Sequence, residues 1–159
     1  MAGKIQIALL LVAWLMAVRW GEWPERAAAL AMLGAHGLDR YYHWLIAGLG
    51  RYGVVDPGHL AIDFYLLASF LTIALAADRQ WTLWAAGAQV VAMLSHPVRL
   101  VSGRVAELAY AVMIQAPSYL QTALIFVGIA FAALRCGRLR SGRRWSRSPA
   151  TEREPWPNG

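Results

Sequence analysis

Residues 60–77 read LAIDFYLLASFLTIALAA, eighteen residues interrupted by one charged side chain, Asp63. An apolar helix of about 20 residues is long enough to cross the hydrocarbon core of a bilayer, which is about 30 Å thick. Residues 78–80 then make a very short connection to a second apolar run over residues 81–95, and Pro97 follows it. Two helices joined so closely predict an antiparallel helical hairpin.

Further apolar runs lie on the N-terminal side of this hairpin. Residues 5–18 (IQIALLLVAWLMAV) follow Lys4, a pattern that is also typical of a signal peptide. Arg19 and a tryptophan-rich stretch come next without a small-residue cleavage site, which favours an uncleaved span. Residues 26–50 form the next predicted span, although Asp39 and Arg40 fall near its middle. The alternative for this segment is an amphipathic helix lying along the membrane surface.

The C-terminal side of the hairpin contains a short apolar helix and a longer one. Residues 105–114 form the short piece, Pro117 breaks or kinks the pattern, and residues 119–134 form the last predicted span. The short piece either lies flat on the membrane or extends the last span at an angle. We therefore predict an all-α, polytopic transmembrane helical bundle over residues 1–136, with about five spans or, alternatively, four. Residues 137–159 are predicted to be a disordered basic tail.

Composition supports a membrane location. Of the 159 residues 58% are hydrophobic and 15% are charged, whereas soluble domains carry about 25% charged residues. The net charge of +6 lies mostly at the C-terminus, where seven arginines from Arg135 onward oppose two glutamates. Cytoplasmic segments are enriched in arginine, so the C-terminus is expected in the cytoplasm and, with five spans, the N-terminus outside. With four spans the N-terminus would also be cytoplasmic.

The arginine-rich tail has two interpretations. Its arginines are candidates for binding anionic lipid head groups, or they only retain the tail in the cytoplasm. No nucleic-acid partner is expected, because the tail lacks an aromatic stacking surface beyond Trp145 and Trp156. The candidate head-group ligands are Arg138, Arg140, Arg143, Arg144 and Arg147.

Polar residues inside the predicted spans are the candidates for binding a ligand or an ion. His59 and Asp63 are four residues apart, and Gln89 and His96 are seven apart, so each pair shares one helix face. A charge at mid-bilayer costs about 2.5–3.5 kcal/mol on insertion scales, so these groups should face the bundle interior and pair. We expect Asp63 to accept a hydrogen bond from a histidine or from Arg40. The full candidate set is Asp63, His96, His43, Asp39, Arg40, His59 and Gln89.

The sequence carries no motif that specifies a reaction. Phosphate-binding, dinucleotide-binding, zinc-protease and serine-hydrolase signatures are absent from the sequence, and the single cysteine, Cys136, excludes a thiolate zinc site. The histidines and aspartates lack a chelating spacing along the chain, so we predict no metal site and no cofactor. The leading hypothesis is a non-enzymatic accessory or scaffold subunit, whose polar residues fix helix register and whose partner is a membrane protein or a second copy. The alternatives are a small transporter or proton/ion-coupled carrier using the Asp/His cluster, and a haem- or quinone-binding redox component.

Four stretches support a resemblance: RWGEWPER (19–26), DPGHLAIDFYLLA (56–68), WTLWAAGAQVVAMLSH (81–96) and AYAVMIQAPSYLQ (109–121). Together they resemble small multipass inner-membrane proteins of alphaproteobacteria, a group with no assigned activity. The resemblance covers most of residues 19–134 and not the tail. It implies a multipass protein of a bacterial inner membrane and supplies no mechanism. The matching positions are His59 and Asp63, then Trp84, Gly87, Gln89 and His96, then Pro117, Ser118 and Tyr119.

Overall fold

The computed structural model describes residues 2–45, 57–101 and 107–145, and within these ranges the chain is entirely helical apart from two short turns. The all-α class is therefore confirmed. The predicted hairpin of residues 60–95 is also confirmed, with a turn at residues 77–79. The helices are α1 (Ala2–Trp20), α2 (Trp23–Leu45), α3 (Pro57–Ala76), α4 (Gln80–Val101) and α5 (Glu107–Trp145).

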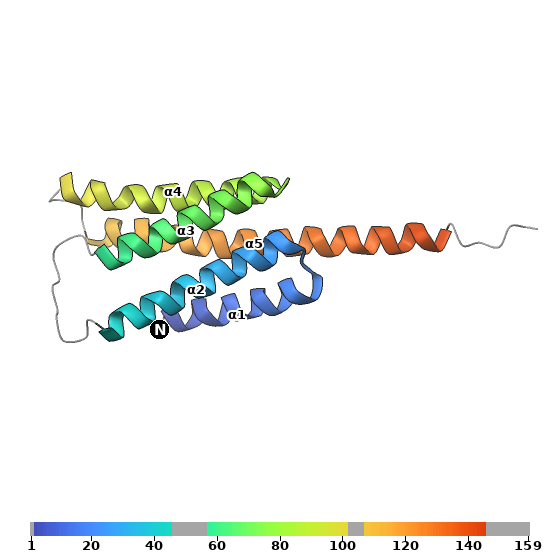
Figure 1. Cartoon of the computed structure of the whole chain (residues 1–159), viewed down its shortest axis with the longest axis horizontal. Coiled ribbons are helices and arrows are strands. Elements are labelled where there is room, and N and C mark those ends of the chain that lie inside the picture. The colour runs from blue at the N-terminus through green and yellow to red at the C-terminus, as the bar shows by residue number, and fades with distance from the viewer. Residues whose placement is uncertain (1, 46–56, 102–106, 146–159) are drawn as a thin grey trace, which may run out of the picture.

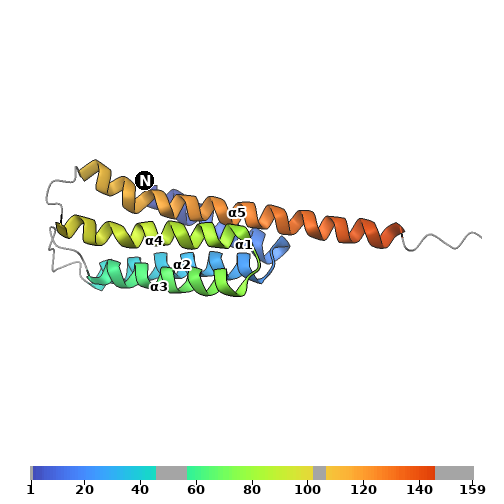
Figure 2. The same cartoon turned by 90° about the horizontal axis from the view of Figure 1, so that it is seen from above.

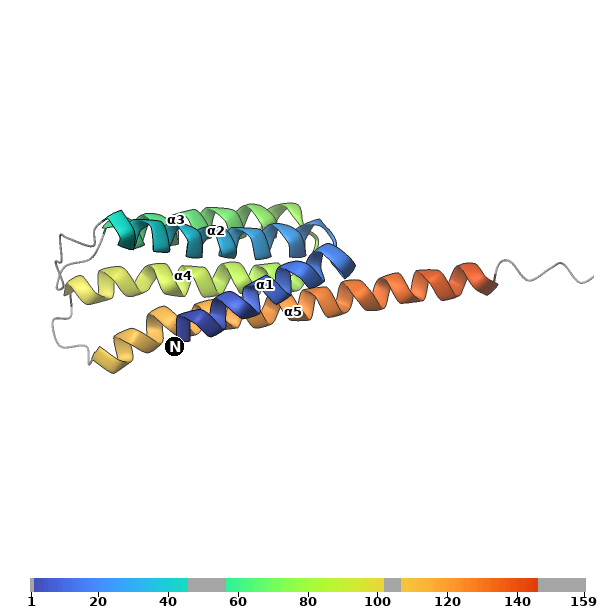
Figure 3. The same cartoon turned by 90° about the horizontal axis from the view of Figure 1, so that it is seen from below.

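The five helices form an up-and-down bundle in which each packs against the next in sequence (Figure 1). The ring is closed because α1 packs against α5, and α2 also contacts α5. Views from above and below show α5 continuing well past the ends of its neighbours (Figures 2 and 3). The bundle has two ends. We call the end with the α1–α2 and α3–α4 turns the glutamate end, and the end where α2 finishes and α3 begins the histidine end.

Two prolines do not end helices where the sequence pattern predicted. α4 continues through Pro97 to Val101, and α5 runs without interruption through Pro117. Each proline removes one backbone hydrogen bond, but both helices continue past it. The segment at residues 105–114, whose placement was open, is therefore part of the last helix from Glu107 onward.

The tail differs from the prediction of disorder in its first residues. Residues 137–145 continue α5 as a helix up to Trp145, so that part of the prediction is wrong. Extending an existing helix needs no new nucleation, and arginine and leucine are good helix formers. Residues 146–159, with Arg147, and residues 46–50 of the predicted second span lie outside the described residues.

The bundle is packed with small residues inside and large apolar residues outside. Its core includes a series of fully buried alanines together with Leu10, Phe70 and Ile125. In contrast Leu75, Trp44 and Trp84 are more than two-thirds exposed. Two stretches of the described residues, Pro57–Ala76 and Gln115–Cys136, are long and apolar enough to cross a membrane. Helix length and composition thus support two spans, and they do not establish the predicted five.

Charged side chains hold the glutamate end together. Glu22, in the α1–α2 turn, pairs with Arg79 of the α3–α4 turn (2.5 Å) and with Arg135 of α5 (3.3 Å). The Glu25 carboxylate accepts a hydrogen bond from the Glu22 backbone N–H, which caps the start of α2. The Arg26 guanidinium donates to backbone carbonyls at the end of α1. Contacts from one carboxylate thus join three parts of the chain that are distant in sequence.

Candidate functional site

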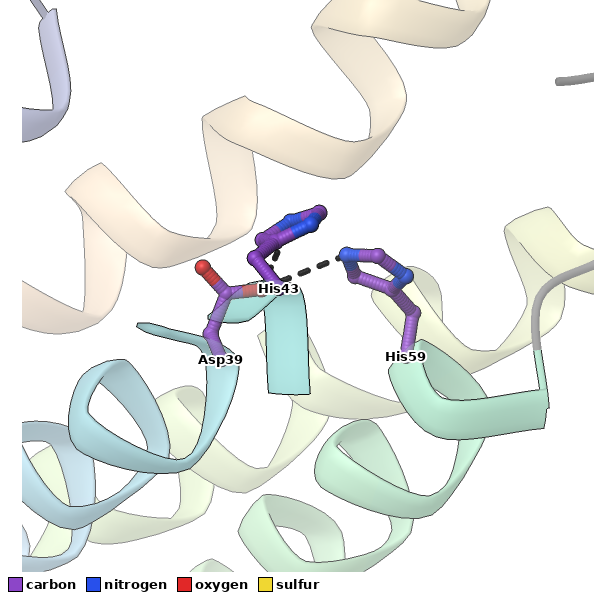
Figure 4. A group of neighbouring side chains, drawn as sticks. All are labelled: Asp39, His43 and His59. Atoms are coloured by element: carbon purple, nitrogen blue, oxygen red, sulfur yellow. Dashed lines mark ion pairs between the residues drawn. The ribbon is translucent and has the colours of Figure 1, made fainter. Parts of the chain in front are cut away.

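Three of the candidate residues converge at the histidine end. Asp39 and His43 lie one turn apart near the end of α2, and His59 lies in the first turn of α3. The Nε2 atoms of His59 and His43 lie 3.2 and 3.6 Å from the same carboxylate oxygen, Asp39 Oδ1 (Figure 4). The ring centroids of the two histidines are 5.1 Å apart. We call Asp39, His43 and His59 the outer cluster.

A second carboxylate–imidazole pair lies deeper in the bundle. His96 Nε2 on α4 is 2.7 Å from Asp63 Oδ2 on α3, so Asp63 pairs with a histidine as expected. The Gln89 side-chain amide donates to the other Asp63 oxygen, Oδ1, and to the Asp63 backbone carbonyl. The two oxygens of the carboxylate are thus engaged by two residues from a single face of α4. We call Asp63 and His96 the inner pair.

The polar chain continues from the inner pair into α5. Gln121 donates to Gln89 Oε1 at 2.8 Å and to the Ala85 carbonyl at 3.2 Å. His96 Nδ1 and Gln121 Oε1 are buried without a hydrogen-bond partner among the described residues. A buried polar atom without a partner is costly. The Gln121 oxygen can therefore accept one more hydrogen bond, and His96 Nδ1 can take one more partner, whose type depends on the ring tautomer.

Exposure falls from the outer cluster to the inner pair and the glutamines beyond it. The His43 side chain is 55% exposed, Asp63 is 23% exposed and His96 is 5% exposed, and Gln89 and Gln121 are almost fully buried. His59 and Asp63 are one turn apart on one face of α3, so the outer cluster and the inner pair lie next to each other along this helix. The side chains therefore form a polar track from the histidine end into the bundle.

Other candidates lie outside this track. Arg40 is exposed on α2, and the described contacts of Asp63 are with His96 and Gln89 rather than with Arg40. His36 also lies on α2, and its Nδ1 contacts the Met32 carbonyl of its own helix. The backbone of α5 carries four of the five candidate head-group arginines, Arg138, Arg140, Arg143 and Arg144.

Sequence reasoning did not select Gln121, although it completes the polar chain. The available signal was that Gln121 places a polar amide inside the apolar run of residues 119–134. It also did not anticipate that Gln6 of α1 donates to the Ser118 hydroxyl of α5. Such partners come from helices far apart in sequence, so spacing along one helix does not reveal them.

Comparison of the chain with protein-family models, with curated proteins and with solved structures gave no match. Imidazole and carboxylate side chains can exchange protons and can bind cations. A track of such pairs with falling exposure is suited to taking up a cation or a proton at the histidine end.

Proposed function

We propose that the chain is a small multipass protein of a bacterial inner membrane that acts as a proton- or ion-coupled carrier through the polar track. The observation that carries this proposal is the falling exposure from His43 through Asp63 to His96. Ionisable residues inside membrane helices are costly and commonly mark proton or ion pathways. Asp63 and His96 would be the central ion-handling pair, with the outer cluster as the entrance.

The arrangement of apolar side chains supports the membrane part of the proposal. Soluble proteins bury their large apolar residues, but this bundle exposes Leu75 and Trp84 and buries alanines. Close approach over small residues is the usual packing of membrane helices. We propose five spans with the N-terminus outside and the arginine-rich C-terminus in the cytoplasm. The histidine end then faces the outside.

Proton flux in reconstituted vesicles tests the carrier proposal. A potential-driven pH change inside vesicles containing the wild-type chain should exceed that in empty vesicles. Asp63→Asn keeps the size of the side chain but replaces one acceptor oxygen with an NH2 donor and removes the ability to bind a proton, so flux should fall at least about tenfold at unchanged protein content. Glu22→Gln, the same chemical change at the glutamate end, should retain flux. Equal flux from wild type and Asp63→Asn would refute the carrier.

An accessory or scaffold subunit is the second candidate, and one observation favours it. The two Asp63 oxygens are engaged, and the Gln89–Gln121 bond ties α4 to α5, as expected of a polar network that fixes helix register. In this case Asp63→Asn would lower the melting temperature in detergent, and wild-type vesicles would show no flux. A haem- or quinone-binding redox role is the remaining alternative, and a visible absorption band in protein made with haem available would favour the haem form.

A further inference from the structure

The outer cluster has the composition of a transition-metal site. Its three side chains each offer one ligand atom, and these atoms all lie within 4.8 Å of one another. We propose that Asp39, His43 and His59 bind a divalent first-row transition-metal ion, with zinc as the reference ion. Two imidazoles and one carboxylate suit zinc and its neighbours better than magnesium or calcium, which prefer sites made wholly of oxygen.

The distances are close to those that a tetrahedral ion requires. Zinc bonds of 2.0–2.2 Å to nitrogen and oxygen place neighbouring ligand atoms about 3.3 Å apart. The Asp39 oxygen already lies 3.2 Å from the His59 nitrogen and 3.6 Å from the His43 nitrogen. Two of the three ligand separations thus match a tetrahedral ion, and no two ligand atoms are more than 4.8 Å apart. Three protein ligands leave the fourth coordination position for water. Zinc sites with such an open position can exchange the water for another ligand.

The surrounding residues orient the ligands. Asp39 and His43 share a face of α2 because they are four residues apart. The Tyr42 ring packs edge-on against His59, with centroids 5.7 Å apart. Tyr42 also lies directly over Gly58, where an added Cβ would collide with its ring. Gly58 thus allows Tyr42 to lie beside His59, and Tyr42 is a positioning residue for that ligand.

If the chain is a carrier, the metal site makes a divalent transition-metal ion its cargo. As an entrance for cargo the outer cluster rests on the proposed function, because only a carrier would pass the ion on to Asp63. As a binding site it depends on its own geometry alone. The three ligands are partly exposed at the end of the bundle, so an ion can reach them from solution. Because the ion can bind there without being transported, binding and transport can be measured separately.

Binding is tested with zinc alone on the full chain in detergent, purified through a tag without histidine. The background variant is Cys136→Ser, because Cys136 is an exposed free thiol that would bind zinc itself. Competition with a chromophoric indicator should give one zinc per chain, and cobalt should give the visible bands of a tetrahedral site. His43→Ala and, separately, His59→Ala should each weaken binding at least about tenfold, whereas His36→Ala, on the same helix, should not.

The outcomes separate this inference from the proposed function. Equal zinc affinity in wild type, His43→Ala and His59→Ala would overturn the metal site, whatever the flux measurements show. Weakened binding in both variants, with melting temperatures in the absence of zinc unchanged, would establish it. Zinc flux in vesicles then tests the cargo role. Zinc binding without zinc flux would keep the site and overturn its role as an entrance, and proton flux without zinc binding would keep the carrier and overturn the site.

Discussion

The two ends of the bundle are held by carboxylates with different partners. At the glutamate end Glu22 pairs with two arginines, whose guanidinium groups stay charged at any physiological pH. At the histidine end Asp39 and Asp63 pair with imidazoles, a class of side chain that can exchange a proton or bind a metal ion. The first arrangement fixes the chain and the second is able to change state. The two ends of the bundle therefore differ in the chemistry that the partners of their carboxylates allow.

At the glutamate end, the largest expected effect on stability comes from a substitution of Gly128. An added Cβ there would lie 2.7 Å from the ring of Trp81, which opens α4 beside the glutamate end. Gly128→Ala should lower the free energy of unfolding by about 1–3 kcal/mol through overpacking. Gly87→Ala is the matched control, since its Cβ would meet nothing within 4 Å, and it should be neutral or slightly stabilising. Equal melting temperatures for the two variants in detergent would contradict this account.

A smaller loss of stability is expected from a substitution where the polar track reaches α5. Gln121→Leu keeps a similar side-chain volume but leaves Gln89 Oε1 without its donor from α5. A buried acceptor that loses its partner costs about 1–2 kcal/mol. The double variant Gln89→Leu/Gln121→Leu should recover part of the loss in the α4–α5 contact, although Asp63 then loses its amide donor. Additive losses in a double-mutant cycle would show that the two amides are not coupled.

The smallest effect is expected from the glutamate end's own ion pairs. Glu22, Arg79 and Arg135 are each a quarter or more exposed, so solvent weakens their attraction. Glu22→Gln should cost about 1 kcal/mol or less, and the cost should shrink as salt is raised. Thermal unfolding in low and high salt measures this. A cost that does not depend on salt would mean that packing, rather than charge, joins the two turns.

The fold class and much of the track could be predicted from single-helix periodicity. The spacing of Gln89 and His96 put both on one face of α4, and both contact Asp63 in the structure. The convergence of His59 on Asp39 could not be predicted, because it depends on how α2 and α3 are placed side by side. The same holds for Glu22 and Arg135, which are 113 residues apart. The proline signal also misplaced the end of α4, which continues through Pro97, and Pro117 does not break α5.

The length of α5 has a mechanical consequence. Its 39 residues span about 58 Å at 1.5 Å per residue, roughly twice the thickness of a bilayer's hydrocarbon core. The nine residues after Cys136 add about 14 Å of straight helix, which is more than the depth of one head-group layer. In a membrane α5 would therefore act as a rigid spacer. It would hold Trp145 at a fixed distance from the lipid surface, on the water side.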